Sequence, residues 1–178
     1  MMPQNRPQSG EYAPFYANYI ALVPSGDYLD ILQSQLRDWK LLLGGLSEEQ
    51  AGFRYAPEKW SIKEVVGHIT DTERIFAYRL LRMARGDQTP LPGFEQDDYV
   101  KTANSSGRKM QDLLEEFSSV RHATISLVRS LDHASWLRRG VANQKEITVF
   151  ALAFIIAGHE RHHRIILEER YLPALPPA

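Results

Sequence analysis

The spacing of apolar residues along the chain predicts four long helices. Apolar side chains recur every three or four positions, the period that places them on one face of an α-helix. The predicted helices cover residues 27–43, 61–85, 108–131 and 148–172. Glycines follow the first two, and Pro173 prevents the last from continuing. Four helices with one apolar stripe each can bury those stripes together only as a bundle, so the pattern predicts an all-α four-helix bundle in a single domain, residues 1–178.

The second predicted helix has the clearest start signal. Ser61 stands three residues before Glu64, so its hydroxyl and the Glu64 carboxylate can each accept a hydrogen bond from a free backbone N–H of the other. Trp60, just before this cap, can pack on Val65 beyond it as a hydrophobic staple. Ser25 offers a cap for the first helix.

The segments between the helices contain no convincing pair of strands. Residues 47–50 repeat the Ser-x-x-Gln capping pattern and predict a short helical turn. The segment 86–104 is predicted to be an irregular loop, longer than the roughly two to eight residues that usually join bundle helices. Such a loop can cover a site or cross the bundle, so the direction of each helix stays open.

Composition narrows the class of protein. The chain has 178 residues, 43% of them hydrophobic and 24% charged, as expected of a globular domain. Its formal net charge of -1 provides no broad positive field, so we expect no nucleic-acid partner and no anionic membrane surface as partner. The absence of cysteine excludes disulfides, thiolate metal ligands and a cysteine nucleophile. Any metal must therefore bind to nitrogen or oxygen.

Two further patterns bear on location. The first residues lack a basic stretch followed by an apolar run, so we expect a cytoplasmic protein. The most apolar stretch, residues 149–158, covers about half of the ~20 residues that cross a bilayer. We therefore expect it to be a core helix.

Candidate metal ligands cluster in the fourth helix, in the string GHERHH. His159 and His163 are four residues apart, so their side chains lie on one helix face with ~5–6 Å between Cβ atoms. This spacing lets two imidazoles reach one ion with bonds of ~2.0–2.1 Å. His162 competes as a partner three residues from His159, but it falls at the edge of the apolar arc, so His163 is the better candidate.

Less specific interpretations stay open for each histidine. Inward histidines are often hydrogen-bonded core residues, and a basic cluster can be a solvated helix end. His68 is the best candidate for a third ligand, although it lies at the shoulder of its helix's apolar stripe and spacing alone would not select it. His122 and His133 have no partner at ligand spacing and are expected at the surface or at a loop end.

The same cluster also matches the H-E-x-x-H motif of zinc proteases, with Glu160 as the base. Those enzymes generally take a third ligand from downstream, yet fifteen residues remain after His163 and no strand is evident for substrate binding. We therefore disfavour a protease and keep Glu160 as a weak candidate base for another hydrolytic reaction.

Several strings, in order along the chain, resemble the DinB/YfiT-like superfamily of metalloenzymes. The resemblance covers nearly the whole chain and is carried by APFYANYIALVPSGD, YAPEKWSIKEVVGHITDTERIFAYRLLRMARGD, LPGFEQDDYV, VRHATISLVRSL and FIIAGHERHHRIILEERYL. The histidine motif is weak alone, but its combination with the KWS-x-K-E-x-x-GH block at the right distance is specific.

This resemblance implies a four-helix bundle, often dimeric, that binds one divalent metal through three histidines. By likeness, these are His68, His159 and His163 in this chain. Activities of relatives include transfer of low-molecular-weight thiols, thiol-dependent isomerisation and suspected hydrolysis, all on small-molecule substrates.

Three neutral imidazoles leave at least one coordination position free for solvent or substrate. We therefore predict a divalent-metal enzyme of transferase or hydrolase type, with Zn2+ or Ni2+ as cofactor, that activates water or a low-molecular-weight thiol cosubstrate. The alternative is a non-catalytic bundle in which the metal has a structural or regulatory role.

Two groups of charged residues in the second helix each have two possible roles. Glu64 and Asp71 can orient imidazoles or form ordinary surface ion pairs, and we favour the ion pairs. Arginines of the same helix can bind an anionic thiol or substrate, or can simply be solvated. They are Arg74, Arg79, Arg82 and Arg85.

The first half of the fourth helix, VFALAFIIAG, is apolar around its whole circumference. A bundle buries one stripe of each helix, so the face with Phe150 and Phe154 needs a second cover. We predict a homodimer, with the connecting loops as the competing cover.

Overall fold

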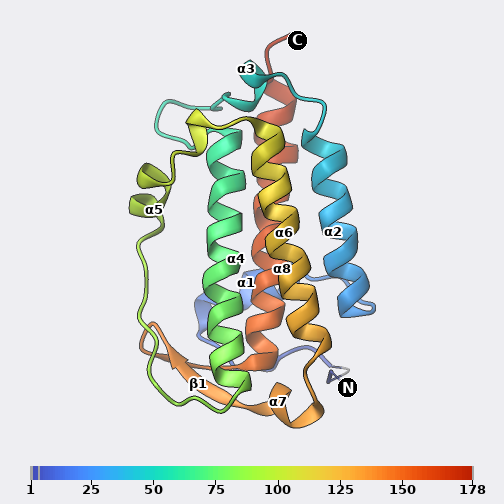
Figure 1. Cartoon of the computed structure of the whole chain (residues 1–178), viewed down its shortest axis with the longest axis vertical. Coiled ribbons are helices and arrows are strands. Elements are labelled where there is room, and N and C mark those ends of the chain that lie inside the picture. The colour runs from blue at the N-terminus through green and yellow to red at the C-terminus, as the bar shows by residue number, and fades with distance from the viewer. Residues whose placement is uncertain (1, 4, 178) are drawn as a thin grey trace.

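A computed structural model describes residues 2–3 and 5–177 and confirms the all-α four-helix bundle. The bundle helices are α2 (Tyr28–Leu43), α4 (Ile62–Ala84), α6 (Met110–Arg129) and α8 (Val149–Ile166). A π-helical turn (Leu167–Tyr171) and a 3-10 turn (Leu172–Ala174) extend α8. Figure 1 shows the four helices side by side along the long axis.

The helix starts follow local hydrogen bonding. Ser61 and Glu64 form the predicted capping box of α4, and Ser47 and Gln50 form the same box for α3 (Glu48–Ala51). Asp27, rather than the expected Ser25, caps α2, because its carboxylate lies close enough to accept from two backbone N–H groups of the first turn.

The connection between α4 and α6 is a crossover. In Figure 1, α2 and α8 run upward and α4 and α6 run downward, so the chain returns along the outside of the bundle between α4 and α6. The predicted irregular loop 86–104 is partly wrong, because it contains the short helix α5 (Gln96–Thr102); a 3-10 turn (Ser105–Gly107) follows.

A β-hairpin, which the sequence analysis missed, joins α7 (His133–Leu137) to α8. Strands β1 (Arg139–Ala142) and β2 (Lys145–Thr148) pair antiparallel. Asn143 and Gln144 form the turn with φ of 49° and 61°, the conformation that two-residue hairpin turns require. The hairpin also holds the crossover, since Leu91 N–H donates to the Val141 carbonyl (2.9 Å) and Asn143 N–H donates to the Leu91 carbonyl (3.0 Å).

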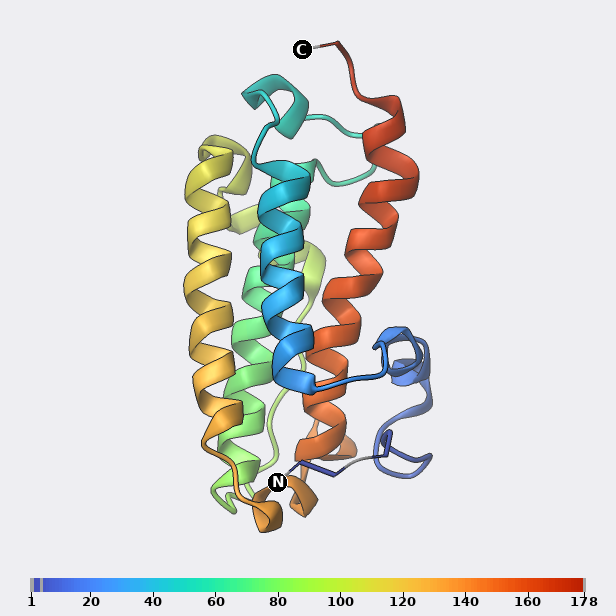
Figure 2. The same cartoon turned by 90° about the vertical axis from the view of Figure 1, so that its right-hand side faces the viewer.

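The chain itself covers the second apolar face of α8. The 3-10 turn Pro14–Tyr16 leads into α1 (Ala17–Leu22), which packs along α8, as Figure 2 shows. Tyr28 stacks on Phe154 at 5.9 Å between ring centroids, and Trp136 of α7 meets Phe150 edge to face at 6.4 Å. Phe150 is buried and Phe154 is half-buried, so most of the face on which we based the homodimer is covered within the chain, and the homodimer stays a prediction. None of the described helices has the length and apolar character to cross a membrane.

A buried polar layer separates two apolar clusters of the core. One cluster gathers around the first half of α8 and the other around its end. Between them, the fully buried Arg121 donates from Nε and Nη2 to Glu73 Oε2 (3.0 and 2.8 Å) and from Nη1 to Gln35 Oε1 (2.6 Å). Trp39 Nε1 donates to Glu160 Oε1 in the same layer. The layer links all four bundle helices at the height of the histidine cluster.

Candidate metal centre

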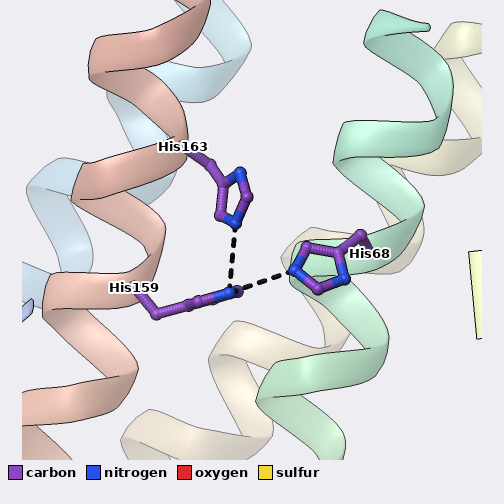
Figure 3. Close-up of side chains that lie close together, drawn as sticks. All are labelled: His68, His159 and His163. Carbon is purple, nitrogen blue, oxygen red and sulfur yellow. Dashed lines mark hydrogen bonds between the residues drawn. The ribbon is translucent and has the colours of Figure 1, made fainter. Parts of the chain in front are cut away.

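Three imidazoles from two helices converge at mid-height of the bundle. His159 and His163 project from α8 and His68 projects from α4 (Figure 3). His159 Nε2 lies 3.1 Å from His68 Nε2 and 3.2 Å from His163 Nε2, and one nitrogen from each ring lies within 4.8 Å of the others. The structure thus brings together the three histidines that the sequence analysis singled out.

Aromatic side chains orient two of the three rings. Trp60 lies over His68 with ring centroids 4.6 Å apart, and Tyr19 meets His159 edge to face at 5.4 Å. In the part of the chain that the structure describes, the remaining ring nitrogens of the three histidines make no hydrogen bond. The rings are therefore held by packing, with their Nε2 atoms directed at a common point.

Burial favours the neutral form of each ring. His68 and His159 are 4% and 6% exposed. Burial lowers the pKa of His68 to about 4. Burial and the neighbouring imidazoles hold the pKa values of His159 and His163 well below the usual histidine value. Near pH 7 all three rings carry a free lone pair and no charge, which is the form that binds a metal.

The donor set fits a divalent ion. A tetrahedral ion with bonds of ~2.0–2.1 Å separates its nitrogen ligands by about 3.3 Å, close to the distances of 3.1 and 3.2 Å from His159 Nε2 to its two neighbours. The third pair, His68 and His163, lies within 4.8 Å, so these two rings must move closer together for all three nitrogens to bind one ion. Hydrogen bonds alone do not satisfy the three ring nitrogens, because one N–H of His159 cannot donate to both neighbouring nitrogens at once. A cation satisfies all three lone pairs together.

A cavity of about 270 Å³ borders the cluster. His68 and His159 form part of its wall, together with residues of the N-terminal segment, α4, the crossover and the hairpin turn. The remaining lining residues are Phe15, Tyr16, Tyr19, Thr72, Phe76, Arg79, Gly93, Phe94, Glu95, Gln96 and Asn143. A small molecule in this cavity would lie directly against two of the three imidazoles.

The other candidates lie outside the cluster. His162 is half-buried beside Tyr19 (5.2 Å between ring centroids), and the exposed His122 is bonded to its own helix at the Ser118 carbonyl (2.7 Å). His133 is exposed at the start of α7.

Glu160 points away from the cluster into the polar layer. It is 1% exposed, its Oε1 accepts from Trp39, and it does not belong to the cavity lining described above. Burial raises its pKa to about 7. The H-E-x-x-H spacing is therefore present without the geometry of a base that faces the three histidines.

The carboxylates near His68 serve the helix and the surface. Glu64 caps α4 and bonds Arg54 at 2.8 Å, and Asp71 pairs with Arg74 at 3.0 Å. Among the described residues, neither carboxylate forms a hydrogen bond with a histidine ring. Their ion pairs with arginines agree with the alternative that the sequence analysis favoured.

Sequence reasoning missed three contributors to the site, and it named Arg79 only as one of four arginines whose role stayed open. Tyr19 and Trp60 orient the rings, and Thr72 and Arg79 line the cavity. Thr72 and Arg79 follow His68 by four and eleven positions, so the helical period could have placed them on its face. Tyr19 reaches the site from outside the bundle, and no local pattern signals this.

Comparisons with known proteins place the chain in a family. The model of the DinB superfamily matches residues 31–167. The chain belongs to the DinB superfamily. This confirms the resemblance drawn from the sequence, with the match covering all four bundle helices except the first turn of α2.

Proteins similar to this chain carry names that mention metals. A putative metal-dependent hydrolase of Geobacillus kaustophilus is 23% identical over 128 residues, which cover 71% of this chain and 72% of that protein. Another of Oceanobacillus iheyensis is 24% identical over 124 residues, covering 68% and 70%. The solved structure of YfiT from Bacillus subtilis, described as a probable metal-dependent hydrolase with an unusual four-helix bundle topology, superimposes with a TM-score of 0.68 at 15% identity, covering 93% of this chain and 91% of that one.

Proposed function

We propose that this chain is a metal-dependent enzyme of hydrolase type that acts on a small molecule in the cavity beside the histidine cluster. His68, His159 and His163 would bind one divalent ion, Zn2+ or Ni2+. The observation that carries the proposal is the convergence of three neutral imidazoles, two of which line a cavity. The names of the relatives support the same class of reaction.

Each side chain has a distinct role in this proposal. The three imidazoles hold the ion in a fixed position, and Tyr19 and Trp60 keep two of the rings in orientation. A bound divalent ion supplies Lewis-acid activation of a nucleophile, which in a hydrolase is water. Aromatic side chains on the cavity wall would lower the dielectric around a bound substrate, which strengthens electrostatic interactions between substrate and protein. We assign Glu160 a structural role in the polar layer.

Transfer of a low-molecular-weight thiol is the second candidate reaction. The family resemblance implies it, and the same donor set suits a thiol as well as water. A panel of aryl esters, compared with a thiol supplied together with an epoxide, separates the two reactions. Turnover of esters alone supports the hydrolase, and turnover that requires the thiol supports the transferase.

Metal analysis tests the ligands directly. We expect about one Zn2+ or Ni2+ per chain in protein purified without a histidine tag, and loss of this metal in His163→Ala. The matched control is His162→Ala, which removes the neighbouring ring of the same helix and should retain the metal. Equal, substoichiometric metal in all three proteins would contradict the assignment.

Removal of the ion tests its role in catalysis. Chelation should abolish ester hydrolysis by the wild-type protein, and added Zn2+ should restore it. A chain that binds metal with full occupancy but turns over neither panel would favour the non-catalytic alternative.

A further inference from the structure

One face of α4 lies along the whole cavity. His68, Thr72, Phe76 and Arg79 all line it, with spacings of four, four and three residues, which keep side chains on one side of a helix. From His68 to Arg79 this face rises about 16 Å at 1.5 Å per residue. The cavity therefore has a metal-ligand end and an arginine end.

Arg79 is a buried cation without a counter-ion. It is 3% exposed, and among the described residues no carboxylate forms an ion pair with it. Its Nη2 donates to the Pro92 carbonyl at 2.6 Å, and its guanidinium lies 5.6 and 5.8 Å from the ring centroids of Phe76 and Phe94. Other arginines of the same helix behave differently, since Arg74 and Arg82 pair with carboxylates at the surface.

Burial of an unpaired charge destabilises a fold unless another group compensates it. One hydrogen bond and two aromatic rings use only part of the guanidinium, which has five N–H donors in a planar fork. Because Arg79 lines the cavity, an anion there can complete its hydrogen bonding.

We propose that Arg79 binds the carboxylate of an elongated, monoanionic substrate whose reacting group lies at the histidine end. This inference rests on the proposed function for the location of the reacting group, and it adds the chemical class of the substrate. Phe15, Tyr16 and Phe94 offer apolar contacts for the middle of such a molecule. Thr72 lies between the two ends, where the residue is 2% exposed and its buried hydroxyl has no partner among the described residues.

The charge balance favours a carboxylate over a phosphate monoester. Arg79 is the only Lys or Arg among the described lining residues, and Glu95 adds a negative charge to the same wall. A phosphate monoester carries about −1.5 to −2 charges near pH 7, which one guanidinium does not neutralise. A carboxylate carries one charge and matches the planar fork.

Binding to the metal-free protein tests Arg79 without any catalysis. The probes are phenylbutyrate, its neutral analogue phenylbutanol and phenylbutyl phosphate, titrated by calorimetry. We expect phenylbutyrate to bind at least about tenfold more tightly than the other two, because only it supplies a single negative charge to the fork. Arg79→Met should reduce its affinity to that of phenylbutanol, whereas Arg85→Met, at an exposed arginine that follows the same helix, should leave the preference intact.

Two results overturn the inference. One is equal affinity of the wild type for the carboxylate and the alcohol, or a preference for the phosphate. The other is a preference that survives in Arg79→Met. Arg79→Gln is the second variant, because it removes the charge while a side-chain amide can still donate to the Pro92 carbonyl. It should lose the preference even if Arg79→Met fails to fold.

Ester hydrolysis by the Zn2+-loaded protein separates this inference from the proposed function. With the mono-nitrophenyl ester of glutarate and its neutral methyl diester, Arg79→Met should raise KM for the anionic ester alone and leave kcat nearly unchanged. Carboxylate preference without metal-dependent hydrolysis would refute the proposed function only. Metal-dependent hydrolysis of both esters with equal KM would refute the role of Arg79 only.

Discussion

His159 is the central residue of the histidine cluster. Its Nε2 is the atom that approaches both His68 and His163, and its ring is fixed by Tyr19. Burial keeps all three rings in the neutral form near neutral pH, so metal binding there does not have to compete with a second proton on each ring. The same burial makes the metal-free cluster sensitive to acid.

The first prediction concerns this sensitivity. In the unfolded chain His68 titrates near its usual pKa of about 6.5, whereas in the folded chain its pKa is about 4. Below pH 6.5 the unfolded state therefore binds more protons than the folded state, and the free energy of unfolding falls as pH decreases toward 4. At about 1.4 kcal/mol per pKa unit, His68 alone accounts for a loss of about 3 kcal/mol.

Urea denaturation of metal-free protein at several pH values between 7 and 4 measures this loss. His68→Gln should show a flatter dependence than the wild type over the same range. An identical slope in the two proteins would contradict the role of His68 in the acid sensitivity.

At the scale of elements, a close contact between α1 and α8 positions Tyr19 over the cluster. A Cβ placed on Gly158 would lie 1.9 Å from the backbone carbonyl oxygen of Tyr19, so only glycine permits this approach. Gly67 has a related role on α4, where a Cβ would lie 2.1 Å from Ser105 Oγ. Each glycine directly precedes a histidine of the cluster. At the site, therefore, another segment of the chain packs closely against α8 at Gly158 and against α4 at Gly67.

The second prediction is that Gly158→Ala destabilises the fold by about 1–3 kcal/mol, the usual range for overpacking. Alanine favours a helix interior over glycine by about 1 kcal/mol, so a net loss would show that displacement of α1 outweighs this gain. Thermal and urea denaturation measure the change. The control is Gly45→Ala, where a Cβ would meet nothing within 4 Å. Equal effects of the two substitutions would refute the importance of the contact.

At the scale of the whole molecule, the polar layer links the bundle through Arg121. The third prediction is that Arg121→Met destabilises the protein by about 3–5 kcal/mol, because it leaves Glu73 buried without its partner. Arg74 and Glu116 also connect α4 to α6, at 2.6 Å, but on the surface. Arg74→Met should therefore change stability by at most about 1 kcal/mol.

Urea denaturation of both variants measures this contrast. The double variant Arg121→Met/Glu73→Leu should recover part of the lost stability, because it removes the unpaired charge. Equal effects of the buried and the surface substitution would show that the layer contributes no more than an exposed ion pair.

Much of this architecture could be predicted from the sequence. The helical period and the Ser61 and Ser47 capping patterns identify the helices because those signals depend on neighbouring residues. The hairpin was missed because its strands have four residues each and its turn, Asn143–Gln144, lacks the glycine that usually marks such turns. The crossover could not be deduced, since a loop of this length permits either direction of the next helix.

The site was predictable to a similar extent. The spacing of His159 and His163 is a property of one helix, whereas the inclusion of His68 depended on likeness to a family. The cavity forms where α1, the crossover and the hairpin turn contact one another. Because these segments are far apart in the sequence, no local pattern predicts the cavity. Arg79 could be named from the sequence only as one arginine among four.

The crossover between α4 and α6 has an evolutionary consequence. It supplies Gly93, Phe94, Glu95 and Gln96 to the wall of the cavity, while the three imidazoles come from the helical frame. Substitutions in the crossover can accumulate without disturbing the packing of the bundle helices. Homologous chains can therefore differ in the substrates that they accept and still keep the three histidines. Chimeras that exchange the crossover between two homologues would therefore transfer substrate selectivity from one protein to the other.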